Sequence, residues 1–550
     1  MNARVTHAHA CLTGLCLLGL ALAWHNRFVQ DDAFISFTYA KHLVQGQGLT
    51  WFGTHVEGYS NFLWVLWIAL GLKVGAEPVS WSYVGGLAAF VTTIYATWRL
   101  AGRLLDALVP RVLAVGLLIT NYTVSAYATG GLETMLQTGL LCIAVWQFYE
   151  VRARPTPVSW RVSAISLTLA AAVLTRMDSL LPSAILGLWG LVYLVRRRAP
   201  LRAYRLAVVP FGAVLGAWLV WKHGYYGRAL PNSYYIKVVD VAGTYENGLT
   251  YLARFFHWYW IWPVLLVGLV ALLVRAVAAR GTTLKLDLLP ILPIVLAWFA
   301  YVVRVGGDFM EFRFLVPVAP YVFIAAAYFL WLGFRSRVRA VPVAVSAAAG
   351  LLLAGASYRH AQTFTGMTAD KTLDSIALLS TFYELYPDGD WGKIGRALKE
   401  AVGGQNVVIA TPASGAIPYY GDIKTVDMCG LNDLWIPGHG RRAPPEHRRP
   451  GHQWAATLSY LKERGVHLVL GHPTLVDRGL VSHPASTRTC QELVHRMLFM
   501  NREPIGEATV VAMPVEERSA LVMWYLTAHP MVDDLIQRRR WESQRVYVER

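Results

Sequence analysis

Long apolar runs separated by short basic loops fill the first two thirds of the chain. Most approach the roughly 20 residues that an α-helix needs to cross a bilayer, so they predict membrane-spanning helices. We predict about eleven spans on this pattern. The runs are 10–24, 83–98, 112–128, 132–149, 162–175, 181–195, 206–221, 255–274, 288–303, 314–334 and 341–356.

One further run, 62–76, is too short for a span and is interpreted as re-entrant or interfacial. Counting it as a span would move Arg99 and Arg103 to the outer side, against the tendency of basic loops to stay in the cytoplasm. The basic cluster Arg196–Arg198 then also lies in the cytoplasm. The pattern therefore predicts an N-terminus inside and a C-terminus outside.

The remaining third has no spanning run and contains short strand-like segments at 406–410 and 466–470. We therefore expect a multi-pass α-helical membrane protein with a C-terminal soluble mixed α/β extracytoplasmic domain. Residues 1–357 form the membrane domain, with a first outer loop at 25–81 and another at 222–254, and residues 358–550 form the soluble domain. Cys429 and Cys490 are either a disulfide or two unpaired, partly buried thiols.

Composition agrees with this organisation, because 55% of the residues are hydrophobic, only 15% are charged and the formal net charge is +16. The acidic residues of the membrane half gather at the predicted outer ends of the spans. A transporter would place ionisable groups within the spans, whereas these spans are nearly free of them. The chemistry is thus expected at the outer surface, near Asp31, Asp32, Glu57, Glu133, Asp178, Asp308 and Glu311.

The pair Asp31–Asp32 directly follows the first span and precedes an amphipathic stretch that is typical of a helix lying on the membrane surface. One carboxylate could cap that helix. A second carboxylate at the membrane boundary suits a general base that takes a proton from a sugar hydroxyl. We expect Asp31 to be this base and Asp32 to cap the helix or orient a cation.

No nucleotide-binding loop is present, because the chain has no GxxxxGK[ST] run and Gly46-Gln47-Gly48 lacks a strand-to-helix setting. A sugar carried on a polyprenyl phosphate would reach an outer site through the bilayer. Its phosphate needs outer cations, and an aromatic loop at 223–237 forms either a sugar-stacking wall or an interfacial belt. The candidate cations are Arg27, Lys41, Lys237, Arg304 and Arg313.

A set of motifs in one order resembles the GT-C membrane glycosyltransferases, and within them the mycobacterial terminal β-(1→2)-arabinofuranosyltransferases. Each motif alone is weak, whereas the ordered set covers nearly the whole chain and is specific. The motifs are Asp31-Asp32, GxG at 46–48, VEGYSN at 56–61, TGGLET at 129–134, TRMD at 175–178, GYYGRALPNS at 224–233, RVGGDFMEFR at 304–313, VDMCGLND at 426–433 and the TCQE run containing Cys490.

The resemblance implies a GT-C fold, an inverting transfer from a polyprenyl-phosphate sugar to a cell-envelope glycan or protein, and Asp31 or Asp32 as base. Arabinofuranose is the expected sugar, and a hexosyl or aminopentosyl transfer to lipid A or protein stays open. So do two other classes, a lipid-linked-glycan transporter and a sugar-binding scaffold. The expected substrate-binding residues are Lys41, Glu57, Tyr59, Asn61, Glu133, Arg176, Asp178, Tyr225, Tyr226, Asn232, Lys237, Asp308 and Arg313.

The same interpretation predicts a bacterial inner-membrane protein whose partners are the lipid-linked donor, the acceptor and the membrane lipids. We expect no cofactor, no bound metal and no nucleic acid. The need for a divalent cation stays open.

Overall fold

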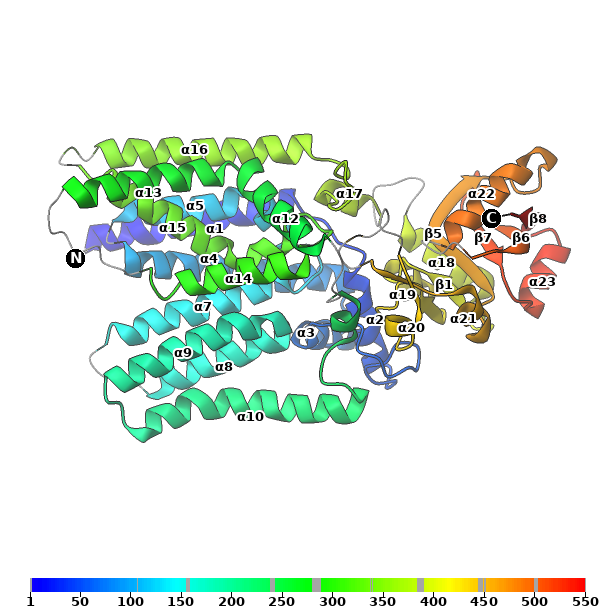
Figure 1. Cartoon of the computed structure of the whole chain (residues 1–550), viewed down its shortest axis with the longest axis horizontal. Coiled ribbons are helices and arrows are strands. Elements are labelled where there is room, and N and C mark those ends of the chain that lie inside the picture. Colours follow the sequence, from blue (N-terminus) through cyan, green and yellow to red (C-terminus); the bar gives the residue numbers. More distant parts are fainter. Residues whose placement is uncertain are drawn as a thin grey trace.

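A long bundle of helices is joined at one end to a smaller domain built on a β-sheet (Figure 1). The computed structural model describes residues 2–105, 107–154, 159–237, 243–278, 288–336, 338, 340–382, 390–443, 449, 452–498 and 503–549. The N-terminus lies at the end of the bundle that is far from the β-sheet domain, as Figure 1 shows.

The bundle contains a helix for each predicted apolar run. Its helices are α1 (Asn2–His25), α2 (Ala33–Val44), α3 (Phe62–Lys73), α4 (Pro78–Leu104), α5 (Leu108–Thr120), α6 (Tyr122–Ala126), α7 (Thr134–Arg152), α8 (Ser159–Thr175), α9 (Leu180–Arg196), α10 (Leu201–Tyr226), α11 (Asn232–Lys237), α12 (Thr244–Trp258), α13 (Ile261–Ala278), α14 (Leu292–Val305), α15 (Ala319–Gly333) and α16 (Ala340–Thr363). Two 3₁₀ turns, η1 (Met177–Ser179) and η2 (Arg313–Val318), precede α9 and α15.

The chain is a multi-pass membrane protein, but the number of spans differs from the expected one. Six helices in the described residues are long and apolar enough to cross a membrane, and α12 with α13 makes a seventh if this pair, bent by 76°, counts as one span. Four further apolar helices are shorter: α3, α5, most of α8, and α14. The count of eleven spans is therefore not confirmed.

One predicted local structure is wrong because tertiary contacts override the local pattern. The segment after Asp32 is a helix, α2, but it is buried on nearly all sides between α3 and the C-terminal domain rather than lying on a membrane surface. The outer loop predicted at 222–254 contains α11 and the start of α12. The bend at Tyr259 and Trp260 also assigns the first residues of the run 255–274 to α12.

The C-terminal domain has a six-stranded mixed sheet in the order β2-β1-β5-β7-β6-β8. Its strands are β1 (Ile409–Thr411), β2 (Thr425–Asp427), β5 (Leu468–Asp477), β6 (Gly506–Pro514), β7 (Ser519–Tyr525) and β8 (Glu542–Val548), and β3 (Arg441–Arg442) pairs separately with β4 (Trp454–Ala455). Strands β2, β1 and β5 run parallel, and the others are antiparallel. The helices around it are α17 (Ile376–Ser380), α18 (Trp391–Val402), α19 (Ala416–Gly421), α20 (Ile436–His439), α21 (Leu458–Glu463), η5 (Pro484–Ser486), α22 (Thr487–Met497) and α23 (Pro530–Gln537).

This domain confirms the expected mixed α/β class, and β1 and β5 fall on the two predicted strand segments. Cys429 and Cys490 are both buried, and each is a free thiol. The disulfide considered from the sequence is therefore absent, and the reading with two unpaired thiols is the correct one.

Hydrogen bonds and an ion pair connect the C-terminal domain to the bundle. The indole of Trp51 donates to the carbonyl oxygen of Thr425 at 2.8 Å, and the ammonium of Lys41 binds Asp422 at 2.7 Å. The Asn232 side chain donates to the carbonyl oxygens of Gly430 and Asp433 at 2.8 and 2.7 Å. The two halves thus meet through buried and half-buried hydrogen bonds, which set the geometry of the cavities between them.

Candidate active site

A cavity of about 420 Å³ lies where the bundle meets the C-terminal domain, and we name it the inner cavity. Seven separate segments of the chain contribute to it, and Leu431 of the C-terminal domain closes one side. Nine of the residues expected from the sequence line it: Asp32, Tyr59, Asn61, Glu133, Arg176, Asp178, Lys237, Asp308 and Arg313.

One wall of the inner cavity is a chain of charge-assisted hydrogen bonds between the starts of α7 and α9. Arg176 donates to Glu133 at 2.6 Å and to Asp178 at 2.8 Å. Asn61 donates to the second oxygen of Glu133 at 2.6 Å, and Gln137 donates to Asp178 at 2.6 Å. Such bonds are short and strong, so these side chains have fixed positions.

Another part of the lining comes from the turn between α14 and η2. Gly306 and Gly307 have φ values of +82° and +75°, and a Cβ at Gly307 would lie 2.8 Å from Tyr251, so this tight turn requires glycine. It directs Asp308 toward Arg313, whose Nε donates to the carboxylate at 2.7 Å. Both side chains are buried, so this pair is pre-formed.

Lys237, the last residue of α11, also lines the inner cavity. Burial lowers its pKa, and the nearby Asp308 and Asp32 oppose that effect. Within the part of the chain that the structure describes, its ammonium forms no hydrogen bond or ion pair. A half-buried cation without a bonded partner is costly, which favours the binding of an anion beside it.

Asp32 lies on the same cavity and forms no salt bridge with any described residue. Burial raises the pKa of its carboxyl, while Lys237 and Arg313 oppose this shift. A carboxylate with a raised pKa is a better proton acceptor near neutral pH than an ordinary Asp. Asp32 is the first residue before α2, but its side chain makes no capping hydrogen bond.

Asp31 faces the C-terminal domain instead. Its Oδ1 accepts a hydrogen bond from the backbone N–H of Ala416, at the start of α19, at 2.8 Å. Burial raises the pKa of Asp31 to about 7, and the adjacent Asp32 adds to this increase. The two neighbouring carboxylates are therefore not equivalent, and Asp31 caps a helix of the other domain rather than α2.

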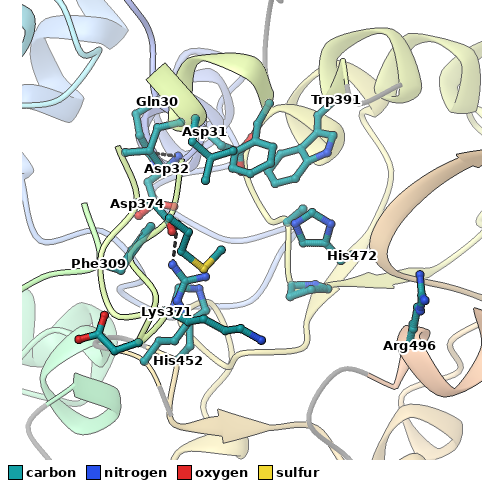
Figure 2. A pocket seen from close by; sticks show the side chains of 18 of the residues that line it. Gln30, Asp31, Asp32, Phe309, Lys371, Asp374, Trp391, His452, His472 and Arg496 are labelled. Carbon is teal, nitrogen blue, oxygen red and sulfur yellow. Dashed lines mark hydrogen bonds and ion pairs between the residues drawn. The ribbon is translucent and has the colours of Figure 1, made fainter. Parts of the chain in front are cut away.

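A second and larger cavity, of about 680 Å³, opens on the other side of Asp32 and is named the outer cleft (Figure 2). Asp31 and Asp32 line it together with residues of the C-terminal domain. Phe382 stacks on Trp391 with ring centroids 4.8 Å apart and an angle of 12° between the rings. Arg449 forms an ion pair with Asp374 at 2.6 Å.

Figure 2 shows Trp391 and His472 on one side of the outer cleft and Phe309 and Asp374 on the other. The sequence did not single out these cleft residues, because they come from segments that meet only in the folded chain. Flat aromatic faces with polar groups between them are typical of sites that bind sugars or other amphipathic molecules.

The remaining expected substrate-binding residues do not line either cavity. Glu57 forms a buried ion pair with Lys222 at 2.8 Å, and burial raises the pKa of Glu57 to about 7 although Lys222 opposes this. The Tyr226 hydroxyl bonds that of Tyr59 at 3.0 Å, and Tyr225 packs against His55. Lys41, Tyr225, Tyr226 and Asn232 do not line either cavity.

Of the other candidate cations, Arg304 lines the inner cavity, whereas Arg27 packs on Trp24 and lies away from it. Glu311 is bonded to His360 at 2.8 Å outside both cavities. Among the described residues, no group of three or more His, Cys, Asp or Glu side chains is arranged to hold a metal ion.

The architecture is the GT-C fold of membrane glycosyltransferases. The chain superposes on ArnT from Cupriavidus metallidurans bound to undecaprenyl phosphate with a TM-score of 0.56 and 12% identity, over 95% of this chain and 98% of that one. The archaeal oligosaccharyltransferase AglB from Archaeoglobus fulgidus, in complex with an inhibitory peptide and a dolichol-phosphate, gives a TM-score of 0.56 at 11% identity, over 94% and 74%.

The arabinofuranosyltransferase AftD from Mycobacteria is similar with a TM-score of 0.50 and 12% identity, over 94% of this chain and 40% of AftD. Residues 380–516 match the model of a domain of unknown function, DUF8728. No curated protein matches the sequence. At these identities the likeness is one of fold.

Proposed function

We propose that the chain is a glycosyltransferase that moves a sugar from a polyprenyl phosphate to an acceptor on the extracytoplasmic side of a bacterial inner membrane. The observation that carries this proposal is the position of Asp32. Its carboxylate, free of any salt bridge in the described chain, lies between two cavities, and Lys237, also without a bonded partner there, faces one of them.

In this mechanism the inner cavity holds the donor headgroup. The donor phosphate lies beside Lys237 and the cationic side of the Arg313–Asp308 pair. Cations at this point stabilise the negative charge that grows on the leaving phosphate as the anomeric carbon–oxygen bond breaks. Arg176 and the two carboxylates that it bonds, Glu133 and Asp178, would position the sugar hydroxyls.

The acceptor enters from the outer cleft, where the stacked Phe382 and Trp391 offer flat apolar faces. Asp32 takes the proton of the attacking hydroxyl, and the hydroxyl oxygen forms the new bond to the anomeric carbon while the phosphate leaves with the bonding electrons. One base and one displacement invert the anomeric configuration. We therefore propose Asp32, rather than Asp31, as the base.

For the donor sugar we propose arabinofuranose, and for the acceptor a cell-envelope glycan. The sequence motifs and the fold that the chain has in common with AftD support this choice. A hexosyl or aminopentosyl transfer to lipid A or protein is the alternative within the same chemistry. The ionisable groups of the site lie at helix ends rather than in the middle of the long apolar helices, which argues against the transporter.

The decisive experiment is a donor panel. Purified protein in liposomes receives synthetic polyprenyl-phosphate sugars one at a time with an envelope extract, and mass spectrometry measures the mass added to the acceptor. A pentose increment from the arabinofuranosyl donor alone is expected. A hexose increment would replace the proposed sugar, and no increment from any donor would overturn the transferase function.

A further inference from the structure

A third cavity lies at the end of the bundle opposite the C-terminal domain. It has a volume of about 430 Å³ and is formed by the last turns of α7 and α9 and by the turn at Leu289 and Pro290. From α9 come Trp189, Val192, Tyr193 and Arg196, which have the i, i+3, i+4, i+7 spacing of one helix face. Arg197, Phe148 and Arg152 complete its wall.

This cavity is far from the candidate active site. Helix α7 starts directly after Glu133, and α9 starts two residues after Asp178, so both helices run from the inner cavity to this one. At 1.5 Å per residue, helices of this length separate the two cavities by about 25 Å. That distance approaches the thickness of the hydrocarbon core, so the third cavity lies near the other membrane surface.

The cavity is rich in positive charge. Arg152, Arg196 and Arg197 line it, and no carboxylate does. In the described part of the chain none of the three forms an ion pair, and the guanidinium groups of Arg197 and Arg152 instead lie over the rings of Tyr193 and Tyr149. Guanidinium groups gathered around a hollow are suited to a phosphate, which they can bind in a bidentate manner.

The surroundings indicate a lipid rather than a soluble phosphate. Beside the lining face of α9, Leu188 and Val195 are 64% and 62% exposed, so an apolar surface runs alongside the cavity. Trp189 lines the cavity together with the arginines, and tryptophan is common at membrane interfaces. A phosphodiester headgroup would fit among the arginines while its acyl chains follow Leu188 and Val195.

We propose that this cavity binds the headgroup of an anionic phospholipid, such as phosphatidylglycerol. Basic cavities between helices at the cytoplasmic surface of membrane proteins have this chemistry. A bound lipid would hold together the ends of α7 and α9, the two helices whose other ends carry the Glu133–Arg176–Asp178 wall.

The test compares two double variants that remove the same number of charges. R196A/R197A removes two arginines that line the cavity, and R202A/R205A removes two exposed arginines of α10 that do not line it. Native mass spectrometry of the full chain in detergent measures binding of dioleoyl phosphatidylglycerol and of dioleoyl phosphatidylcholine, and sn-glycerol 3-phosphate serves as the soluble probe.

We expect the wild type to prefer phosphatidylglycerol and R196A/R197A to bind it about 10- to 30-fold more weakly, while R202A/R205A stays close to the wild type. A third variant, V192W, fills the cavity without changing charge and should also lose the lipid. Equal losses in both arginine variants, no loss in R196A/R197A or V192W, or equally tight binding of glycerol 3-phosphate would each overturn the proposal.

Discussion

Two adjacent carboxylates, Asp31 and Asp32, have different surroundings. Successive side chains at a helix start point in directions about 100° apart, so the two carboxylates cannot serve the same substrate atom. Asp31 accepts a hydrogen bond from the backbone N–H of Ala416. Asp32 lines both cavities and has no ion-pair partner in the described residues. The sequence predicts that one of the two is the base, but a choice between them required knowledge of the other domain.

We expect Asp32→Asn to lower turnover by about 10²- to 10⁴-fold, because the amide keeps the shape of the side chain but cannot accept the proton. Asp31→Asn should retain most of the activity, since an amide oxygen can still accept the hydrogen bond from Ala416. Initial rates in reconstituted membranes with a saturating donor measure the difference.

Thermal unfolding in detergent is the control, and the midpoint of Asp32→Asn should stay near that of the wild type. Near wild-type transfer by Asp32→Asn would contradict the proposed base. Glu57 is not the next candidate, because it is bound to Lys222 behind the inner cavity, whereas Asp308 lines that cavity.

Two cations of the inner cavity, Lys237 and Arg313, should respond differently to removal. Lys237→Ala is expected to raise the donor Michaelis constant about 10- to 100-fold with little loss of stability, since Lys237 bonds to no described residue. Arg313→Ala should weaken donor use and also destabilise the fold by about 3–5 kcal/mol, because it leaves the buried Asp308 without its partner.

Steady-state kinetics and thermal midpoints of the two variants separate these effects, with Lys237→Arg as the charge-preserving control. An unchanged Michaelis constant in both would move the phosphate to Arg304, which also lines this cavity.

Asp31 should make stability depend on pH. Its pKa is about 7 in the folded chain against 3.8 in its ordinary state, so folding favours the protonated form. The contribution to stability is therefore complete below about pH 4 and is lost as the pH rises through 7, by about 1.4 kcal/mol per pH unit at most.

Asp31→Asn removes this titration. Its thermal midpoint relative to the wild type should rise between pH 5 and pH 8, measured in the same detergent. A difference between the two proteins that stays constant with pH would show that Asp31 is ionised throughout, and that the contact with Ala416 is made by a carboxylate.

At the scale of helices and strands, sequence periodicity located the helices of the bundle's apolar runs and two strands, but not their surroundings. Each apolar run is a helix, and β1 and β5 lie where strand-like runs were expected. The pattern failed at α2, whose amphipathic spacing favoured a membrane surface, because its polar side packs on another domain rather than on water. A local pattern cannot reveal a partner that is almost 400 residues away, as Tyr39 and Asn432 illustrate.

The site itself could be predicted only in part, for the same reason. Acidic and basic residues at the helix ends near the C-terminal domain were found because ionisable groups are rare in such an apolar chain. Trp391, Phe382 and Arg449 were not, because aromatic and basic residues are ordinary in a soluble domain and only their position on the same cleft as Asp31 and Asp32 distinguishes them.

The short helix α19 should depend on a close approach at Gly415. A Cβ at this position would lie 2.1 Å from the carbonyl oxygen of Asp31 and 2.4 Å from its carboxyl carbon. We expect Gly415→Ala to displace the C-terminal domain from the loop that carries Asp31 and Asp32. Because this displacement changes the position of the proposed base, the rate of sugar transfer should fall more than tenfold. Gly366→Ala is the matched control, since a Cβ there meets nothing within 4 Å.

Hydrogen exchange of α19 and α2, followed by mass spectrometry, reports on the docking directly. Faster exchange at both helices in Gly415→Ala, and not in Gly366→Ala, is the expected pattern. Unchanged exchange together with full activity would show that the contact between Gly415 and Asp31 does not position the site.

Over the whole molecule, charge is sorted along the bundle. The acidic and bonded groups of the site lie at the end near the C-terminal domain, and Arg152, Arg196 and Arg197 lie at the other end. This separation follows from the sequence alone, because basic loops stay in the cytoplasm. The number of complete crossings does not follow, because the shorter helices α3, α5 and α14 are apolar without being long enough to span by themselves.

The orientation can be tested without knowing the substrate. A reporter enzyme active only outside the cytoplasm should work when it is fused after Arg550 and stay silent when it is inserted at Arg198, and a reporter active only in the cytoplasm should give the opposite result. The physical reason is the basic cluster Arg196–Arg198 at the end of α9, which resists transfer across the membrane. Helix α9 begins two residues after Asp178, which lines the inner cavity, and ends at this cluster. The inner cavity therefore opens on the side of the membrane opposite to the cluster. If the signals were reversed, the cavity would face the cytoplasm, where nucleotide sugars are present, and the reason for proposing a lipid-linked donor would disappear.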